Sequence, residues 1–163
     1  MGNRSKARLV NGVIAAIIVV FFLAHGTLGC TALVFGHMSS LVWIVWVFMA
    51  LVVVHVVVSV VTSREQLTDA ENPPSPRKKR HLALKWATGA GLAVCVAAHV
   101  LLKDAFSARA AIVGVAVTLA IHLCVGSKSL LADLNINRRF QTPFRIVVCA
   151  FAAMFVAAVF VSM

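Results

Sequence analysis

Four histidines stand where the sequence is otherwise apolar. Of the six histidines in this chain of 163 residues, His25, His55, His99 and His122 each lie inside a separate long apolar run. An imidazole is costly in an apolar environment, so it usually has a partner and a role there. Its ring nitrogens are common ligands of transition metals. The four positions indicate either metal coordination or structural polar contacts, and the surrounding sequence has to decide between them.

The apolar runs are long enough to cross a lipid bilayer. The chain is 61% hydrophobic with a mean hydropathy of +0.98, more apolar surface than a soluble domain of this size can bury. A helix needs roughly 20 apolar residues to span the hydrocarbon core. Five stretches qualify, at about 9–35, 41–63, 82–102, 110–131 and 143–163. The second is rich in Val, which in water would favour a strand, but a single open strand cannot satisfy its backbone in lipid. We therefore expect an all-α integral membrane protein with five transmembrane helices in one membrane domain, residues 1–163.

The basic residues set the expected orientation. The net charge is +10, and 13 of the 15 Lys and Arg residues lie in or beside the segments 1–8, 64–81 and 132–142. Positive loops are retained in the cytoplasm, so these segments and the N-terminus are expected inside and the C-terminus outside. The charge then reflects topology rather than nucleic-acid binding. Thr142-Pro143 predicts the N-cap and first turn of the fifth helix.

This orientation gives each histidine a depth. His25 and His99 lie 16 and 17 residues from the inner ends of the first and third runs, or about 24–25 Å. His55 and His122 lie eight and nine residues from the inner ends of the second and fourth, or about 12–13 Å. The chain thus has an outer and an inner pair, on the order of 12 Å apart. Two imidazoles at one height on different helices can hold a haem iron from both sides.

The neighbours of the histidines fit this interpretation. Small residues that could make room for a porphyrin stand one turn away: Gly29, Ser59, Cys95, Thr118 and Gly126. Small residues also line ordinary contacts between membrane helices. Candidate partners for the inner haem propionates are Arg64, Ser127, Lys128, Ser129 and Arg145. For the outer haem they are Lys103 and Arg109. Any of these cations could instead anchor the chain at the interface by snorkelling. We expect the first four helices to form a four-helix bundle that binds two bis-histidine haems.

Two segments resemble a known family. "VNGVIAAIIVVFFLAHGTLGCTALVFG" is similar to the first helix of the dihaem cytochrome b membrane anchors of succinate:quinone oxidoreductases and quinol:fumarate reductases, where a small residue and a glycine, here Asn11-Gly12, precede the histidine. "HLCVGSKSLLADL" resembles the family's pattern at the inner end of a haem helix. The resemblance implies two b haems, a distal one on His25 and His99 and a proximal one on His55 and His122. It also adds Gly12 to the cofactor-binding residues.

The resemblance further implies partners. Anchors of this family dock on their cytoplasmic side to an iron–sulfur subunit that carries a flavoprotein, and electrons pass between the flavin and membrane quinone. We therefore expect an electron-transfer subunit of the bacterial cytoplasmic membrane, with quinone as an exchangeable substrate, and not a complete enzyme. The chain departs from the family in having no acidic residue in the loop after the first run or near His122. His37 is the titratable group of that loop, as a quinone-site candidate or an ordinary interfacial histidine.

Other functions stay open from the sequence. A cytochrome b subunit of a hydrogenase or formate dehydrogenase would also carry membrane histidines, but it matches the His122 segment less well. A divergent anchor could have lost quinone chemistry. A small transporter or assembly protein would be expected to show acidic residues or broken helices near the midplane, and no Asp or Glu lies within a run. The four cysteines all lie in apolar runs without a CxxC motif, so we expect buried apolar side chains rather than disulfides or zinc ligands.

Overall fold

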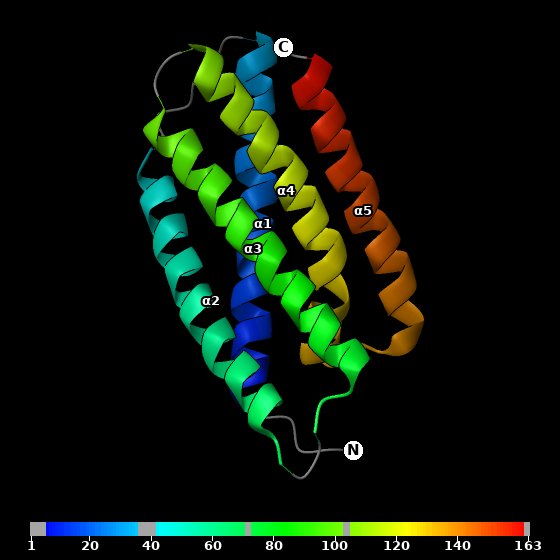
Figure 1. The fold of residues 1–163 in the computed structure, drawn as a ribbon. Coiled ribbons are helices and arrows are strands. Elements are labelled where there is room, and N and C mark those ends of the chain that lie inside the picture. Colours follow the sequence, from blue (N-terminus) through cyan, green and yellow to red (C-terminus); the bar gives the residue numbers. More distant parts are fainter. Residues whose placement is uncertain (1–5, 36–41, 71–72, 103–104, 162–163) are drawn as a thin grey trace. The chain divides into compact units, whose positions relative to one another are not determined.

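Five long helices make up the part of the chain that the computed structural model describes, residues 6–35, 42–70, 73–102 and 105–161. They are α1 (Lys6–Phe35), α2 (Val42–Thr68), α3 (Pro76–Leu101), α4 (Ala105–Asp133) and α5 (Arg138–Val161) (Figure 1). Each is long and apolar enough to cross a membrane. The predicted helical architecture with five candidate spans is confirmed. The Val-rich run lies within α2, as expected if satisfying the backbone outweighs strand preference.

The helices extend beyond the apolar runs at the ends that carry basic residues. α2 continues to Thr68 and α3 starts at Pro76, so much of the segment 64–81, expected to be a loop, is helical. α5 begins at Arg138, where Asn137 is the N-cap and its Oδ1 accepts a hydrogen bond from the N–H of Arg139 at 3.1 Å. Pro143 lies inside α5, so the prediction of an N-cap at Thr142 was wrong. Hydropathy marks the lipid-crossing length, and polar residues can continue a helix past it.

The chain is best described as two compact units. Unit 1 contains α1, α2 and residues 129–136 at the end of α4, and unit 2 contains α3, the rest of α4 and α5. Within unit 1, α1 and α2 run antiparallel (Figure 1). Phe22 packs edge-on against Phe48 with ring centroids 4.6 Å apart, and the Ser59 hydroxyl donates to Oδ1 of Asn11 at 2.9 Å. These two contacts fix the register between the helices.

A capped turn follows α4 and belongs to unit 1. At the end of α4 the N–H of Ile136 donates to the carbonyl of Leu131 at 2.9 Å, and Asn135 takes the left-handed conformation with φ 57°. This is a Schellman cap, which satisfies the last carbonyls of the helix, and Asn tolerates the left-handed position better than most residues. The turn fixes the positions of Asp133 and Leu134, which face α1.

Gly12 lies where α1 meets this turn. A Cβ atom on Gly12 would lie 3.3 Å from Cβ of Asp133 and 3.3 Å from Cδ2 of Leu134. Beside it, Nη2 of Arg8 donates to Oδ1 of Asp133 at 2.8 Å, and Asp133 is only 7% exposed. The ion pair and the close approach together tie the start of α1 to the end of α4.

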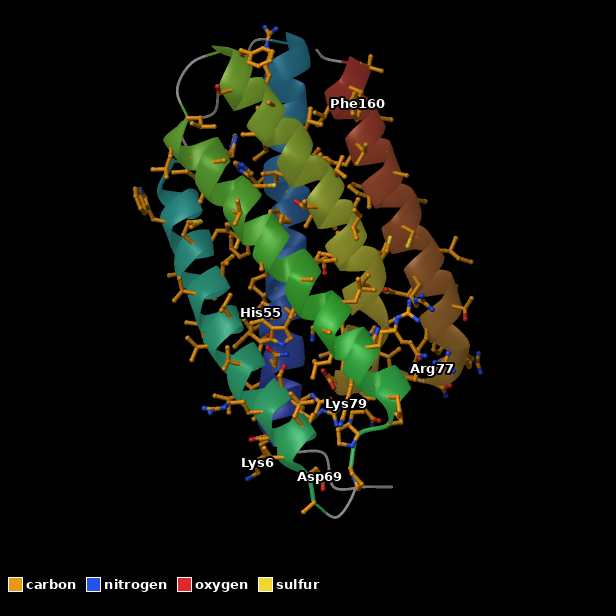
Figure 2. All side chains as sticks on the ribbon, viewed as in Figure 1. Lys6, His55, Asp69, Arg77, Lys79 and Phe160 are labelled. Carbon is orange, nitrogen blue, oxygen red and sulfur yellow. The ribbon has the colours of Figure 1, made fainter. Side chains whose placement is uncertain are left out.

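In unit 2, small residues set the spacing between α3 and α4. A Cβ on Gly114 would lie 3.1 Å from Sγ of Cys95, and one on Gly91 would lie 4.0 Å from Cγ2 of Thr118. Such small residues let membrane helices approach closely. Arg77 and Lys79 at the start of α3 lie at one end of the unit, and Phe160 of α5 lies near the other (Figure 2).

Candidate functional site

Two of the four predicted ligands, His25 and His55, belong to unit 1 and lie at different heights. Because Asn11 faces Ser59 and Phe22 faces Phe48, each step forward along α1 matches one step back along α2. His55 therefore stands level with Ala15, ten residues before His25, or about 15 Å along the helix axis.

The contacts between α1 and α2 also show which face of each helix carries its histidine. His55 is four residues from Ser59, so both lie on the side of α2 that faces α1, and Figure 2 shows the His55 ring directed away from the outer side of the helix. His55 is half-buried and its Nδ1 atom is buried. His25 follows Phe22 by three residues on the same stripe of α1 and is exposed.

Unit 2 repeats the arrangement with its own pair. The contacts of Gly114 with Cys95 and of Gly91 with Thr118 place His99 level with Ala110 on α4. His122 lies 12 residues further along α4, or about 18 Å away. His99 is exposed near the end of α3, and His122 is half-buried.

The ring of His122 is held against α3. Its Nδ1 lies 3.0 Å from Oγ1 of Thr88. A Cβ on Gly89 would lie 3.2 Å from its Cε1, so glycine at this position lets the ring approach the backbone of α3. Thr88 and Gly89 are consecutive residues of α3, so one short stretch of this helix holds the ring.

The Thr88 hydroxyl has three partners within hydrogen-bond distance. The carbonyls of Leu84 and Lys85 lie 3.0 Å and 3.1 Å from its oxygen within α3, and Nδ1 of His122 lies 3.0 Å away. When the single hydroxyl proton goes to a carbonyl, the oxygen accepts a hydrogen bond from Nδ1–H of the imidazole. In that tautomer Nε2 keeps its lone pair, which is the form in which histidine binds a metal.

Some of the predicted small residues pack against other parts of the chain. Ser59, a predicted neighbour of His55, contacts Asn11, and Gly12, which the resemblance added, contacts the turn after α4. Gly29 and Gly126 differ, because a Cβ at either position would meet no described atom within 4 Å. Close helix packing therefore explains Gly12 but does not explain why Gly29 and Gly126 are glycines.

The predicted propionate partners are mostly exposed cations. Arg64, Lys128 and Arg145 are exposed, whereas Ser127 is buried and its hydroxyl donates to the carbonyl of Cys124 at 3.2 Å. Ser129 is half-buried and Arg109 is exposed. His37 and Lys103 lie outside the described residues.

Three contacts were not predicted from the sequence: Thr88 with His122, Arg8 with Asp133, and Cys124 with Cys149. The first two depend on how neighbouring helices rotate against each other, which hydropathy does not encode. The third could have been found by counting depth, since both cysteines lie well inside spans that meet at one short turn.

The chain matches no protein-family model, no curated protein and no solved structure. The resemblance to cytochrome b anchors therefore stays a hypothesis based on the two quoted segments and the histidine pattern. Among the described residues, no three His, Cys, Asp or Glu side chains gather in one place. A bis-histidine haem needs only two protein ligands, so this observation does not bear on the predicted sites.

Proposed function

We propose that the chain is a membrane-anchor cytochrome b subunit. It would bind two b haems, one on His25 and His99 and one on His55 and His122, in a bundle of α1 to α4. It would carry electrons between an iron–sulfur and flavoprotein pair in the cytoplasm and quinone in the membrane, as in enzymes of the succinate dehydrogenase or fumarate reductase type. The basic ends of the helices would face the cytoplasm of a bacterium, with the C-terminus outside.

The contact between His122 and Thr88 is the observation that carries this proposal. Oγ1 of Thr88 lies 3.0 Å from Nδ1 of His122, and two carbonyls of α3 are within reach of the hydroxyl proton. The hydroxyl oxygen can therefore accept from Nδ1–H and leave the Nε2 lone pair for a ligand. Metal-bound histidines characteristically have such a second partner, which sets the tautomer and the ring orientation.

The heights of the four histidines add support. Each unit carries two of these four histidines, separated by roughly 15–18 Å along its helices, so neither pair within a unit could share one iron. The proposed pairing by depth, which takes one histidine from each unit, is compatible with these spacings. When bound, a b haem supplies one-electron transfer between its ferric and ferrous states.

The chain's own residues would position and neutralise the group. Thr88 and Gly89 would orient His122, and Gly29 and Gly126 would leave room for a flat ring at the outer and inner levels. Arg64 and Lys128 would offer positive charge to anionic propionates at the inner level. Gly12 would act indirectly, by holding the start of α1 in place.

The proposal is tested by optical spectroscopy of the purified membrane protein. We expect reduced-minus-oxidised spectra with the bands of b-type haem and a ratio of two haems per chain in a pyridine haemochrome assay. The partner subunits should be purified with the chain from mild detergent. A chain that is folded by circular dichroism but holds no haem when expressed with ample haem supply would contradict the proposal.

Thr88 offers a finer test at a single residue. Thr88→Val keeps the shape and removes the acceptor for Nδ1–H of His122, so the imidazole becomes a poorer donor to iron. We expect the affinity for one haem to fall about 10–100-fold, and the midpoint potential of any haem retained there to rise, with the other haem unchanged. Thr88→Ser should restore both properties.

Thr118→Val is the matched control for this change. Thr118 also lies one turn from His122, but its hydroxyl donates to the carbonyl of Gly114 at 2.6 Å within α4. We expect redox titration of this variant to give the wild-type potentials. Equal shifts in Thr88→Val and Thr118→Val would show that the Thr88 hydroxyl has no specific role.

A further inference from the structure

α4 and α5 bring two thiols into direct contact. Sγ of Cys124 lies 2.8 Å from Sγ of Cys149, and both residues are half-buried. Both are free thiols in this structure, as is Cys95. Cys95 lies instead against Gly114 of α4. The described cysteines form no disulfide, in line with the expectation from the sequence, but the contact between Cys124 and Cys149 was not predicted.

The pair is separate from the contacts of His122. Residues advance by about 100° per position around a helix, so Cys124 points about 200° away from His122 on α4. His122 faces Thr88 of α3, and Cys124 faces Cys149 of α5. One helix thus presents a metal-ligand candidate to one neighbour and a thiol to the other.

The distance between the sulfurs favours a bond between them over a shared metal ion. Two thiolates on a tetrahedral zinc, at about 2.3 Å each, stand roughly 3.8 Å apart, so the sulfurs would have to separate from 2.8 Å to admit the metal. A disulfide needs about 2.05 Å, which requires a further approach of under 1 Å.

We propose that Cys124 and Cys149 are an oxidative modification site that forms a reversible disulfide between α4 and α5. The oxidant is a hydroperoxide. One cysteine, as the thiolate, attacks a peroxide oxygen, the O–O bond breaks, and the products are a sulfenic acid and water or an alcohol. The sulfur of the second cysteine then attacks the sulfenic sulfur, forming the S–S bond and releasing water. Each sulfur loses one electron and the peroxide gains two. A dithiol reductant reverses the bond by exchange.

This modification would tie α5, the described helix without a histidine, to α4. It does not depend on the proposed haems, because neither cysteine is among their ligands. The site can therefore be tested whether or not the chain binds haem.

The test counts thiols in the full-length chain in its membrane. Membranes are treated with hydrogen peroxide, denatured, and labelled with a polyethylene-glycol maleimide that adds a visible mass per free thiol. In a Cys30→Ala/Cys95→Ala variant, we expect both labels to disappear together, with an intact mass lower by two hydrogen atoms. Dithiothreitol should restore both labels. The wild-type chain should lose two of its four labels.

A matched variant keeps Cys149 but pairs it with Cys95 instead of Cys124. In Cys30→Ala/Cys124→Ser, Cys95 lies against Gly114 of α4 and Cys149 against position 124, ten residues or about 15 Å further along that helix, so both labels should survive the same treatment. Three results would overturn the proposal. The first is that the variant with only Cys124 and Cys149 keeps both labels after peroxide, and the second is that single cysteines gain oxygen atoms stepwise. The third is that added Zn²⁺ blocks labelling of both thiols, and that a chelator restores labelling with no change in the mass of the chain. If a variant fails to fold, the number of labels on the wild-type chain still decides, because loss of no label after peroxide would contradict the disulfide.

Discussion

Replacing His122 with Ala is expected to halve the haem content of the purified chain, because the inner iron would lose one of its two protein ligands and the outer iron would keep both. His55→Ala should give the same loss. The measurement is a pyridine haemochrome ratio, supported by electron paramagnetic resonance to count low-spin bis-histidine centres. His81→Ala is the control, since His81 lies at the basic start of α3 and belongs to neither predicted pair.

Double variants distinguish the pairing from a general loss of stability. If His55 and His122 hold the same iron, His55→Ala/His122→Ala should retain as much haem as either single variant, since the second change removes a ligand from an already vacated iron site. His25→Ala/His122→Ala should lose nearly all haem, because it damages both sites. For two independent haem sites, the losses of haem from two changes at the same site should not add, whereas the losses from changes at different sites should add. Wild-type haem content in His122→Ala would contradict the pairing outright.

The sequence predicts the helices well because their physical cause is local. A backbone in lipid has to satisfy its own hydrogen bonds, so each long apolar run becomes a helix whatever its strand preference, as α2 demonstrates. The predicted ends are poorer. α2 continues through Arg64 to Thr68 and α5 starts at Arg138, because polar residues outside the lipid still favour helix and Asn137 supplies a cap.

The heights of the histidines were also accessible from the sequence, since a helix rises by a constant amount per residue. The sequence count set the inner and outer levels on the order of 12 Å apart. The helix registers give about 15 Å in unit 1 and about 18 Å in unit 2. The differences arise because the count assumed that each span starts at the membrane surface, whereas the contacts between helices set the real register.

What the sequence could not supply is rotation. A rotation of about 100° around the helix axis, the step from one residue to the next, decides whether Thr88 or Ala87 faces His122. The same holds for whether Asp133 faces Arg8 or the cytoplasm. Asp133 belongs to the segment 132–142, which the sequence predicts only as a cytoplasmic connection, and its ion pair with Arg8 was missed for this reason. Gly12 was assigned to the cofactor by resemblance, and its packing against the turn after α4 appears only in three dimensions.

Gly12→Leu is expected to destabilise the chain strongly. Even one carbon at this position would lie 3.3 Å from Asp133 and from Leu134, and three further carbons have to displace a turn that a Schellman cap and the Arg8 ion pair both hold. Overpacking of this kind costs about 1–3 kcal/mol. For a chain of this size that corresponds to a Tm lower by about 3–10 °C, measured as loss of the monodisperse peak after heating in mild detergent.

A size series and a second site separate this effect from the presence of a larger side chain on α1. Gly12→Ala should change Tm much less, because a shift of a few tenths of an ångström relieves the contact and alanine favours helix over glycine by about 1 kcal/mol. Ala24→Leu adds the same side chain at an exposed position of α1 and should leave Tm near the wild-type value. If Gly12→Leu and Ala24→Leu had the same Tm, the contact with Asp133 and Leu134 would not explain why position 12 is glycine.

The same variants decide between the two roles of Gly12. If it packs the start of α1, Gly12→Leu should lower the Tm of chain made in cells starved of haem as much as that of chain made with haem, since the contact with Asp133 and Leu134 involves no cofactor. If it instead lines a haem site, as the resemblance implies, the haem-free chain should melt like wild type and only the haem ratio should fall. The distances favour the first outcome, because both neighbours of the added carbon belong to the chain itself.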